Sequence, residues 1–167
     1  MEIELMNLST LLLYPVFLTI MFILTLIFIP RHQYKQYLVY GFLIGGLGDA
    51  VVVTIMQNLL GVMWFKNQGL FSVMGHHALS PPSWTVTFML FLYFLPKRRS
   101  FLYPYILTWS LYSVGYSYVV RNAELYDFRP WLMPYVGCFI FLGWWGFAAW
   151  LFQKTSSLVN EEDNKKA

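Results

Sequence analysis

Apolar residues occur along this chain in five long runs, and all charged side chains but one lie outside these runs, in the connecting segments or near the two ends of the chain. A run of about 18 or more apolar residues with almost no charge can cross about 30 Å of hydrocarbon as a helix. The pattern therefore predicts an all-α integral membrane bundle of five transmembrane helices, at residues 8–29, 38–60, 80–96, 101–120 and 131–152. A polar tail, residues 153–167, is predicted to be flexible and cytoplasmic.

The third run is the shortest of the five. Ser-Pro-Pro-Ser-Trp begins it, with Ser80 predicted as the helix N-cap and Pro81 at the first helical position, and Pro96 ends it. A helix of about 15 to 17 residues is at the low limit for a span. If this run is only re-entrant, the chain has four spans and the later loops change sides of the membrane.

Basic residues are unevenly shared between the loops. The segments after the first, third and fifth runs hold two, three and three of them, which are Arg31, Lys35, Lys97, Arg98, Arg99, Lys154, Lys165 and Lys166. The other loops hold Lys66, Arg121 and Arg129. Because cytoplasmic loops carry the excess of Lys and Arg, the N-terminus is predicted outside and the C-terminus in the cytoplasm. A re-entrant third run would break this pattern, so the charges favour five spans.

The composition agrees with a membrane protein. The chain is 58% hydrophobic and 11% charged, whereas an average soluble domain is about 25% charged. Its net charge of +3 does not indicate a nucleic-acid partner, because the basic residues lie at the ends of apolar runs and form no long cluster. The single cysteine, Cys138, excludes a disulfide within one copy.

Asp49 is the one charged residue in the second run, near its middle. A carboxylate at the bilayer centre costs about 2.5 to 3.5 kcal/mol, so such groups are usually functional or paired. No Lys, Arg or His lies inside another predicted span, and we therefore expect Asp49 to be protonated and to donate a hydrogen bond. It is a candidate ligand anchor or proton relay. The alternative is a single interhelical hydrogen bond, worth about 0.6 kcal/mol.

An aromatic stripe on the fourth run is the candidate partner of Asp49. Its members, at offsets of 0, 4, 7 and 11 residues, lie within about 60° of one another on a helix; they are Tyr105, Trp109, Tyr112 and Tyr116. A bundle interior lined in this way would suit a lipophilic ligand with one polar group. The stripe can equally be ordinary aromatic packing.

Three glycines precede or adjoin Asp49. Gly41, Gly45 and Gly48 form a ridge of small residues that lets another helix approach closely. Packing within the bundle is the favoured use, and homodimerisation is the alternative.

The pair His76-His77 is a weak candidate for a metal or haem site. Metal sites usually need three or four ligands, and adjacent side chains on a helix point about 100° apart. The pair is instead predicted to lie in a solvated or pH-sensitive loop on the outer side. It could reach Asp49 only if that loop dips into the bundle.

Two stretches resemble a known group of proteins. Residues 58–75, NLLGVMWFKNQGLFSVMG, and residues 80–96, SPPSWTVTFMLFLYFLP, are similar to a group of small polytopic membrane proteins of spore-forming Firmicutes. The resemblance covers about residues 38–125 and implies a multi-pass protein of the bacterial cytoplasmic membrane, without an activity. A looser architectural likeness, in span number and aromatic content, links the chain to the tryptophan-rich sensory proteins, which bind porphyrins and sterols.

These features favour a non-enzymatic membrane protein that binds a lipophilic ligand or a membrane protein partner through its interior. The alternative is a proton- or ion-coupled transporter or channel component that uses Asp49, and a metal- or haem-dependent enzyme ranks third. The sequence has no nucleophile with an adjacent base, phosphate-binding glycine loop or HExxH zinc helix. It names no cofactor. The lipid bilayer is the expected surrounding, and self-association stays open.

Overall fold

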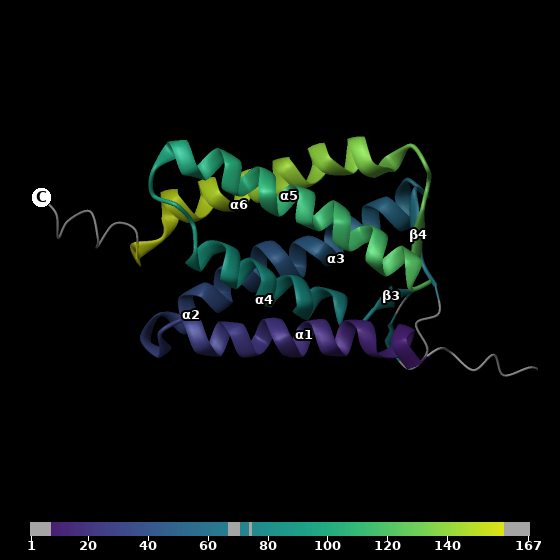
Figure 1. The fold of residues 1–167 in the computed structure, drawn as a ribbon, viewed down its shortest axis with the longest axis horizontal. Coiled ribbons are helices and arrows are strands. Elements are labelled where there is room, and N and C mark those ends of the chain that lie inside the picture. Colours follow the sequence, from purple (N-terminus) through teal and green to yellow (C-terminus); the bar gives the residue numbers. More distant parts are fainter. Residues whose placement is uncertain (1–7, 67–70, 74, 159–167) are drawn as a thin grey trace, which may run out of the picture.

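The computed structural model describes residues 8–66, 71–73 and 75–158 and is mostly helical, which confirms the predicted all-α class. The helices are α1 (Leu8–Phe28), α2 (Arg31–Tyr40), α3 (Leu47–Thr54), α4 (Ser80–Tyr93), α5 (Arg99–Asn122) and α6 (Gly137–Thr155). Three π-helical turns accompany them, η1 (Gly41–Gly46), η2 (Ile55–Leu59) and η4 (Leu132–Val136). Because α2, η1, α3 and η2 follow one another without a break, they form one helical rod (Figure 1).

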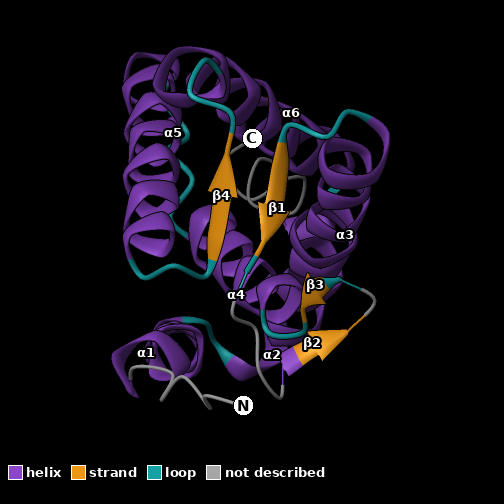
Figure 2. Ribbon diagram, turned by 90° about the vertical axis from the view of Figure 1, so that its right-hand side faces the viewer, coloured by secondary structure: helices purple, strands orange, loops and turns teal. Residues whose placement is uncertain are grey.

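Two short antiparallel strand pairs lie together at one end of the bundle, as Figure 2 shows. Strand β1 (Met63–Phe65) pairs with β4 (Tyr126–Phe128), and β2 (Ser72–Val73) pairs with β3 (His76–His77). The first pair joins residues that are 61 to 65 positions apart in sequence and so ties the α3–α4 connection to the α5–α6 connection. We call this end of the bundle the strand end.

The opposite end carries the α1–α2 turn, the α4–α5 turn and the carboxyl end of α6 (Figure 1). Its basic side chains are Arg31, Lys35, Lys97, Arg98, Arg99 and Lys154. We call it the basic end. Acidic residues of the described chain lie elsewhere, because Asp49 is buried in α3 and Glu124 and Asp127 belong to the strand end.

Helix α4 is the central helix of the bundle (Figures 1 and 2). It packs against α1, against the rod of α2, η1 and α3, and against α6, so that residues 85–92 are all buried. With 14 residues it is about 21 Å long, which is shorter than a hydrocarbon layer of about 30 Å. The neighbouring helices enclose α4. The packed core around it therefore extends only as far as α4 does.

Glycines allow the rod to approach α4 closely. A Cβ atom built on Gly41 would lie 2.6 Å from the backbone oxygen of Thr85, and one on Gly45 would lie 2.6 Å from that of Trp84. Such distances are too short for any side chain, so only glycine fits here. Gly48 instead faces the ring of Trp144, at 3.1 Å. All three glycines therefore serve contacts within one copy of the chain.

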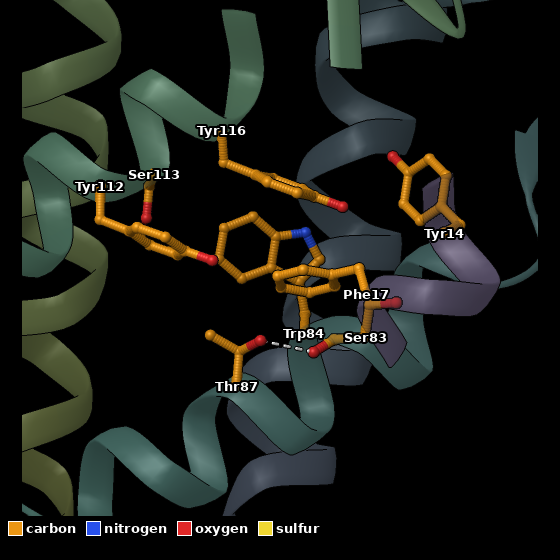
Figure 3. A pocket seen from close by; sticks show the side chains of 8 residues that line it. All are labelled: Tyr14, Phe17, Ser83, Trp84, Thr87, Tyr112, Ser113 and Tyr116. Atoms are coloured by element: carbon orange, nitrogen blue, oxygen red, sulfur yellow. Dashed lines mark hydrogen bonds between the residues drawn. The ribbon is translucent and has the colours of Figure 1, made fainter. Parts of the chain in front are cut away.

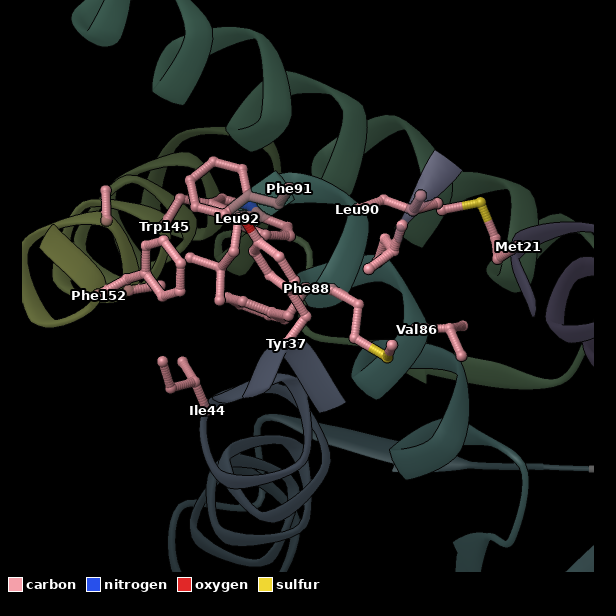
Figure 4. Close-up of a cluster of buried hydrophobic side chains, with 14 residues drawn as sticks. Met21, Tyr37, Ile44, Val86, Phe88, Leu90, Phe91, Leu92, Trp145 and Phe152 are labelled. Atoms are coloured by element: carbon pink, nitrogen blue, oxygen red, sulfur yellow. The ribbon is translucent and has the colours of Figure 1, made fainter. Parts of the chain in front are cut away.

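The main core surrounds α4 and is completed by buried side chains of α1, the rod and α6, while α5 packs against it with partly buried residues (Figure 4). Five of its 14 buried residues are aromatic. Trp145 is fully buried, stacks on Phe88 with ring centroids 4.1 Å apart, and donates its indole N–H to Ser113 Oγ at 3.0 Å. Trp144 donates to the backbone oxygen of Ile44 in η1 at 3.1 Å. Both indole N–H groups are thus satisfied, which removes the cost of burying them.

Helix boundaries differ from the sequence prediction at several points. The second helical rod begins at Arg31 rather than at residue 38, and α4 ends at Tyr93, three residues before Pro96. Helix α6 continues to Thr155, and Gln36 Nε2 donates to Ser156 Oγ, which is buried. The first part of the predicted tail is therefore attached to the bundle, while residues 159–167 lie outside the described residues.

Candidate functional sites

Asp49 lies in the first turn of α3, next to the strand end, and is 5% exposed. The Ser80 hydroxyl forms a side-chain hydrogen bond with the Asp49 carboxyl and another with Tyr14 of α1. Tyr14 and Tyr116 are both close enough to Asp49 to interact with it electrostatically. Within the described residues no salt bridge to Asp49 is present. Its polar neighbours are therefore hydroxyl groups.

Ser80 has a different role from the predicted one. Leu79 is the N-cap of α4, and Ser80 is the first residue of the helix. Its side chain, 3% exposed, turns toward Asp49 instead. Because Ser80 opens α4, the Asp49 carboxyl lies beside the amino end of a helix, where the macrodipole carries about half a positive charge.

The aromatic stripe of α5 does not converge on one place. Tyr105 donates its hydroxyl to the backbone oxygen of Phe91 at 2.9 Å, and Trp109 packs on Phe91 and Trp145 in the main core. Tyr112 and Tyr116 lie further along the helix, toward the strand end. Of the three tyrosines in the stripe, Tyr116 is the one on which Asp49 has an electrostatic effect.

A small cavity separates α1, α4 and α5 near these tyrosines (Figure 3). The hydroxyl groups of Tyr14 and Tyr116 point toward one another across it. Tyr116 is the one described residue with a buried side-chain oxygen or nitrogen that lacks a hydrogen-bond partner. The cavity has a volume of about 10 Å³, which is enough for about one water molecule. It is too small for a lipophilic ligand.

His77 is buried, and the prediction of a solvated loop is wrong for it. The pair forms strand β3 rather than part of a helix. His77 is 2% exposed and stacks on Tyr14 with ring centroids 4.0 Å apart, and its Nδ1 accepts the Leu79 N–H at 3.3 Å. Removal from water lowers the pKa of His77 to about 4, so the ring is neutral at pH 7. The loop thus does fold onto the bundle, next to Tyr14.

Among the described residues, the two histidines have no neighbouring His, Cys, Asp or Glu side chains that would complete a metal site. No group of three His, Cys, Asp or Glu side chains is placed to hold a metal ion in the described part of the chain. Tyr14, which links His77 to Ser80, is not among the sequence candidates. The sequence could have indicated Tyr14, because it is the one tyrosine within the first apolar run.

A much larger cavity opens at the basic end, with a volume of about 1130 Å³. It lies below the carboxyl end of α4, between α2, α5 and α6, and is lined by Tyr93, Lys97, Arg99, Ile106, Gly146 and Trp150 among others. The cause is the shortness of α4. This helix ends at Tyr93, and Pro96 cannot continue it, whereas α5 and α6 extend further along the bundle. None of the predicted site residues lies here.

The strand end is closed by charged and aromatic residues. Asp127 in β4 accepts Lys66 Nζ at 2.7 Å and Arg121 Nε at 2.9 Å. The hydrogen bond from Lys66 lowers the pKa of Asp127 below its usual value. Arg121 also lies over the ring of Phe128, 4.8 Å from its centroid. These contacts hold β1 and β4 over the end of the bundle.

The chain matches no protein-family model, no curated protein and no solved structure. The resemblance to small membrane proteins of Firmicutes, and the likeness to the tryptophan-rich sensory proteins, therefore stay predictions.

Proposed function

We propose that this chain is a multi-pass membrane protein with five spanning helices that binds a lipophilic ligand in the cavity at the basic end. The observation that carries the proposal is that cavity, about 1130 Å³ in volume, at the carboxyl end of α4. Its lining combines apolar and aromatic side chains with polar and basic ones. Ligand sites are typically concave, mostly apolar and about 300 to 1,000 Å³ in size. A non-enzymatic binding role requires no catalytic residues in the cavity.

The surface of the bundle supports a membrane location. Three helical segments are long and apolar enough to cross a membrane, at residues 11–28, 31–59 and 132–155. Large apolar side chains on their outer faces are exposed, including Ile27 at 66%, Leu59 at 78% and Phe139 at 75%. A soluble protein rarely exposes contiguous apolar surface on this scale. Lipid would cover these side chains.

The other two helices fit the same proposal for different reasons. Helix α5 has 24 residues, and its Ser, Tyr and Trp side chains lower its hydropathy while Phe101, Leu107 and Leu111 face outward. Helix α4 is too short to span alone, but its neighbours surround it, so it needs no lipid contact. The basic end then lies in the cytoplasm and the strand end outside, by the excess of Lys and Arg.

Native mass spectrometry of the full chain, purified in mild detergent, tests the binding proposal. We expect a lipid-sized adduct to remain bound and to be exchangeable for an added lipid. Gly146→Leu fills the cavity, because Gly146 lines it and a Cβ there would meet nothing within 4 Å. This variant should lose the adduct.

Gly143→Leu is the matched control. Gly143 lies on the same helix, also has open space around its Cβ position, and does not line the cavity. It should keep the adduct. A wild-type protein that carries no lipid, or a Gly146→Leu variant that carries as much as wild type, would contradict the proposal.

A transporter or channel component that uses Asp49 is the second candidate. It is favoured by the unpartnered Tyr116 hydroxyl and the small cavity close to the Asp49–Ser80–Tyr14 cluster. Asp49→Asn should then abolish a pH-dependent flux in proteoliposomes. An unchanged flux would exclude Asp49 as the coupling group.

A further inference from the structure

We propose that the cavity at the basic end selects lipids with a negatively charged head group, which Lys97 and Arg99 hold at its mouth. This inference rests on the proposed function and adds the class of ligand. It depends on three observations: the sign of the charged lining, the depth at which charged and apolar residues lie, and the charge of the surrounding surface.

Every charged residue that lines the cavity is basic. Lys97 and Arg99 are the charged side chains among the described residues of the lining, and Tyr37, Tyr93 and Tyr103 add hydroxyl groups. A guanidinium group can donate two parallel hydrogen bonds to a phosphate or carboxylate. The lining therefore complements an anion and offers no carboxylate to a cationic ligand.

Charged and apolar residues lie at different depths. Arg99 is the first residue of α5, at the end of the bundle, whereas Ile106 lies seven residues further along the same helix, roughly 10 Å deeper. On α6, Gly146 and Ala149 line the cavity well before the helix ends at Thr155. A ligand with a charged head and an apolar chain would place each part against matching residues.

The surroundings strengthen the positive potential at the mouth. Arg31, Lys35, Arg98 and Lys154 lie at the same end, and Lys154 Nζ is 5.2 Å from the centroid of the Trp150 ring, which lines the cavity. The acidic residues of the described chain are Asp49, Glu124 and Asp127, none of which lines this cavity. Anionic lipids are thus attracted to this end and zwitterionic lipids are not.

A comparison of two lipids with identical chains tests the inference. Full-length protein in detergent is titrated with dioleoylphosphatidylglycerol, whose head is anionic, and with dioleoylphosphatidylcholine, whose head is zwitterionic, and bound lipid is counted by native mass spectrometry. We expect tighter binding of the anionic lipid. Arg99→Gln should weaken it by about threefold to fivefold, as an exposed ion pair allows, and Arg99→Gln with Lys97→Gln by about tenfold.

Arg98→Gln is the matched control. It removes the same charge from the adjacent residue, which does not line the cavity, and should leave the preference unchanged. Equal loss in Arg98→Gln and Arg99→Gln would mean that only the general surface charge matters, which contradicts the inference. Displacement of the lipid by millimolar inorganic phosphate would contradict it too, because the anion alone would then be recognised.

The outcomes separate this inference from the proposed function. If wild type binds both lipids equally and Gly146→Leu loses both, the cavity binds lipid without head-group selection, and only the inference fails. If neither lipid binds more tightly to wild type than to Gly146→Leu, the proposed function fails with it.

Discussion

The polar groups at the two ends of α4 differ in how far they are enclosed by other side chains. At its amino end, Ser80 hydrogen bonds to Asp49 and Tyr14, and His77 stacks on Tyr14, so polar groups are enclosed by each other and by aromatic rings. At its carboxyl end, the helix stops and leaves an open cavity with basic side chains at its mouth. The buried carboxyl of Asp49 thus lies in the closed region, formed by Tyr14, Asp49, His77 and Ser80 at the amino end of α4. The large cavity, the open region, lies at the carboxyl end, where helix lengths are unequal.

The largest expected effect is a difference in unfolding free energy between alanine substitutions at two tryptophans of α6. Trp145 is fully buried, whereas Trp150 is 53% exposed and lines the cavity. Trp145→Ala should lower the free energy of unfolding by about 3 to 5 kcal/mol, because it empties a packed site. Trp150→Ala should cost much less in lipid-free protein. Denaturation in detergent, followed by circular dichroism, measures both, and equal losses would show that the two regions are packed alike.

Alanine substitutions at two glycines should change the stability of the protein in opposite directions. Gly45→Ala places a Cβ against the α4 backbone and should destabilise the protein by about 1 to 3 kcal/mol. Gly143→Ala meets open space and should be neutral or stabilising by up to about 1 kcal/mol, since alanine is the better helix former. The same denaturation assay applies. A stabilising Gly45→Ala would disprove the close contact between η1 and α4.

Acid should weaken the closed region through His77. Because burial holds the folded-state pKa near 4, below the usual value of 6.5, the unfolded chain binds the proton more readily between these values. Stability should therefore be full above pH 6.5 and decline as the pH falls toward 4. Protonation at Nδ1 would also break the hydrogen bond from Leu79.

His77→Phe keeps an aromatic ring against Tyr14 and should flatten that pH dependence. His76→Gln, in the same strand, is the control and should preserve it. The unfolding midpoint, followed from pH 7 to pH 4, decides the matter. A decline of equal steepness in His77→Phe would assign the effect to another group.

The smallest expected effect concerns the hydroxyl contact of Ser80 with Tyr14. A double-mutant cycle of Ser80→Ala with Tyr14→Phe should give a coupling energy of about 0.6 kcal/mol, the average for interhelical hydrogen bonds in membranes. Ser80→Ala with Tyr103→Phe should give no coupling, because Tyr103 lies at the basic end. A zero coupling for the first pair would remove this hydrogen bond from the account.

The long apolar runs predicted the mostly helical fold, because most of them are long enough for a full helix and are followed by proline or charged residues. The glycine ridge predicted close packing, and Gly41 and Gly45 do face α4. These features depend on local sequence alone.

The features that the sequence did not reveal depend on tertiary contacts. Burial of His77 requires Tyr14 of α1, and the turn of Ser80 toward Asp49 requires the rod to lie beside the start of α4. The cavity at the basic end arises from a length difference between neighbouring helices. The short third run signalled that difference, but not which side chains would line the space.

Photolabelling tests most directly the claim that a lipid occupies the basic end rather than the closed region. The wild-type protein and Gly146→Leu are each exposed to a phosphatidylglycerol with a photoreactive group in its acyl chain, at less than one lipid per protein, and labelled peptides are mapped by mass spectrometry. The account predicts labels within residues 93–106 and 146–153 that disappear in Gly146→Leu. Labels concentrated in residues 83–87, beside the small cavity, or labels unaffected by Gly146→Leu, would contradict it.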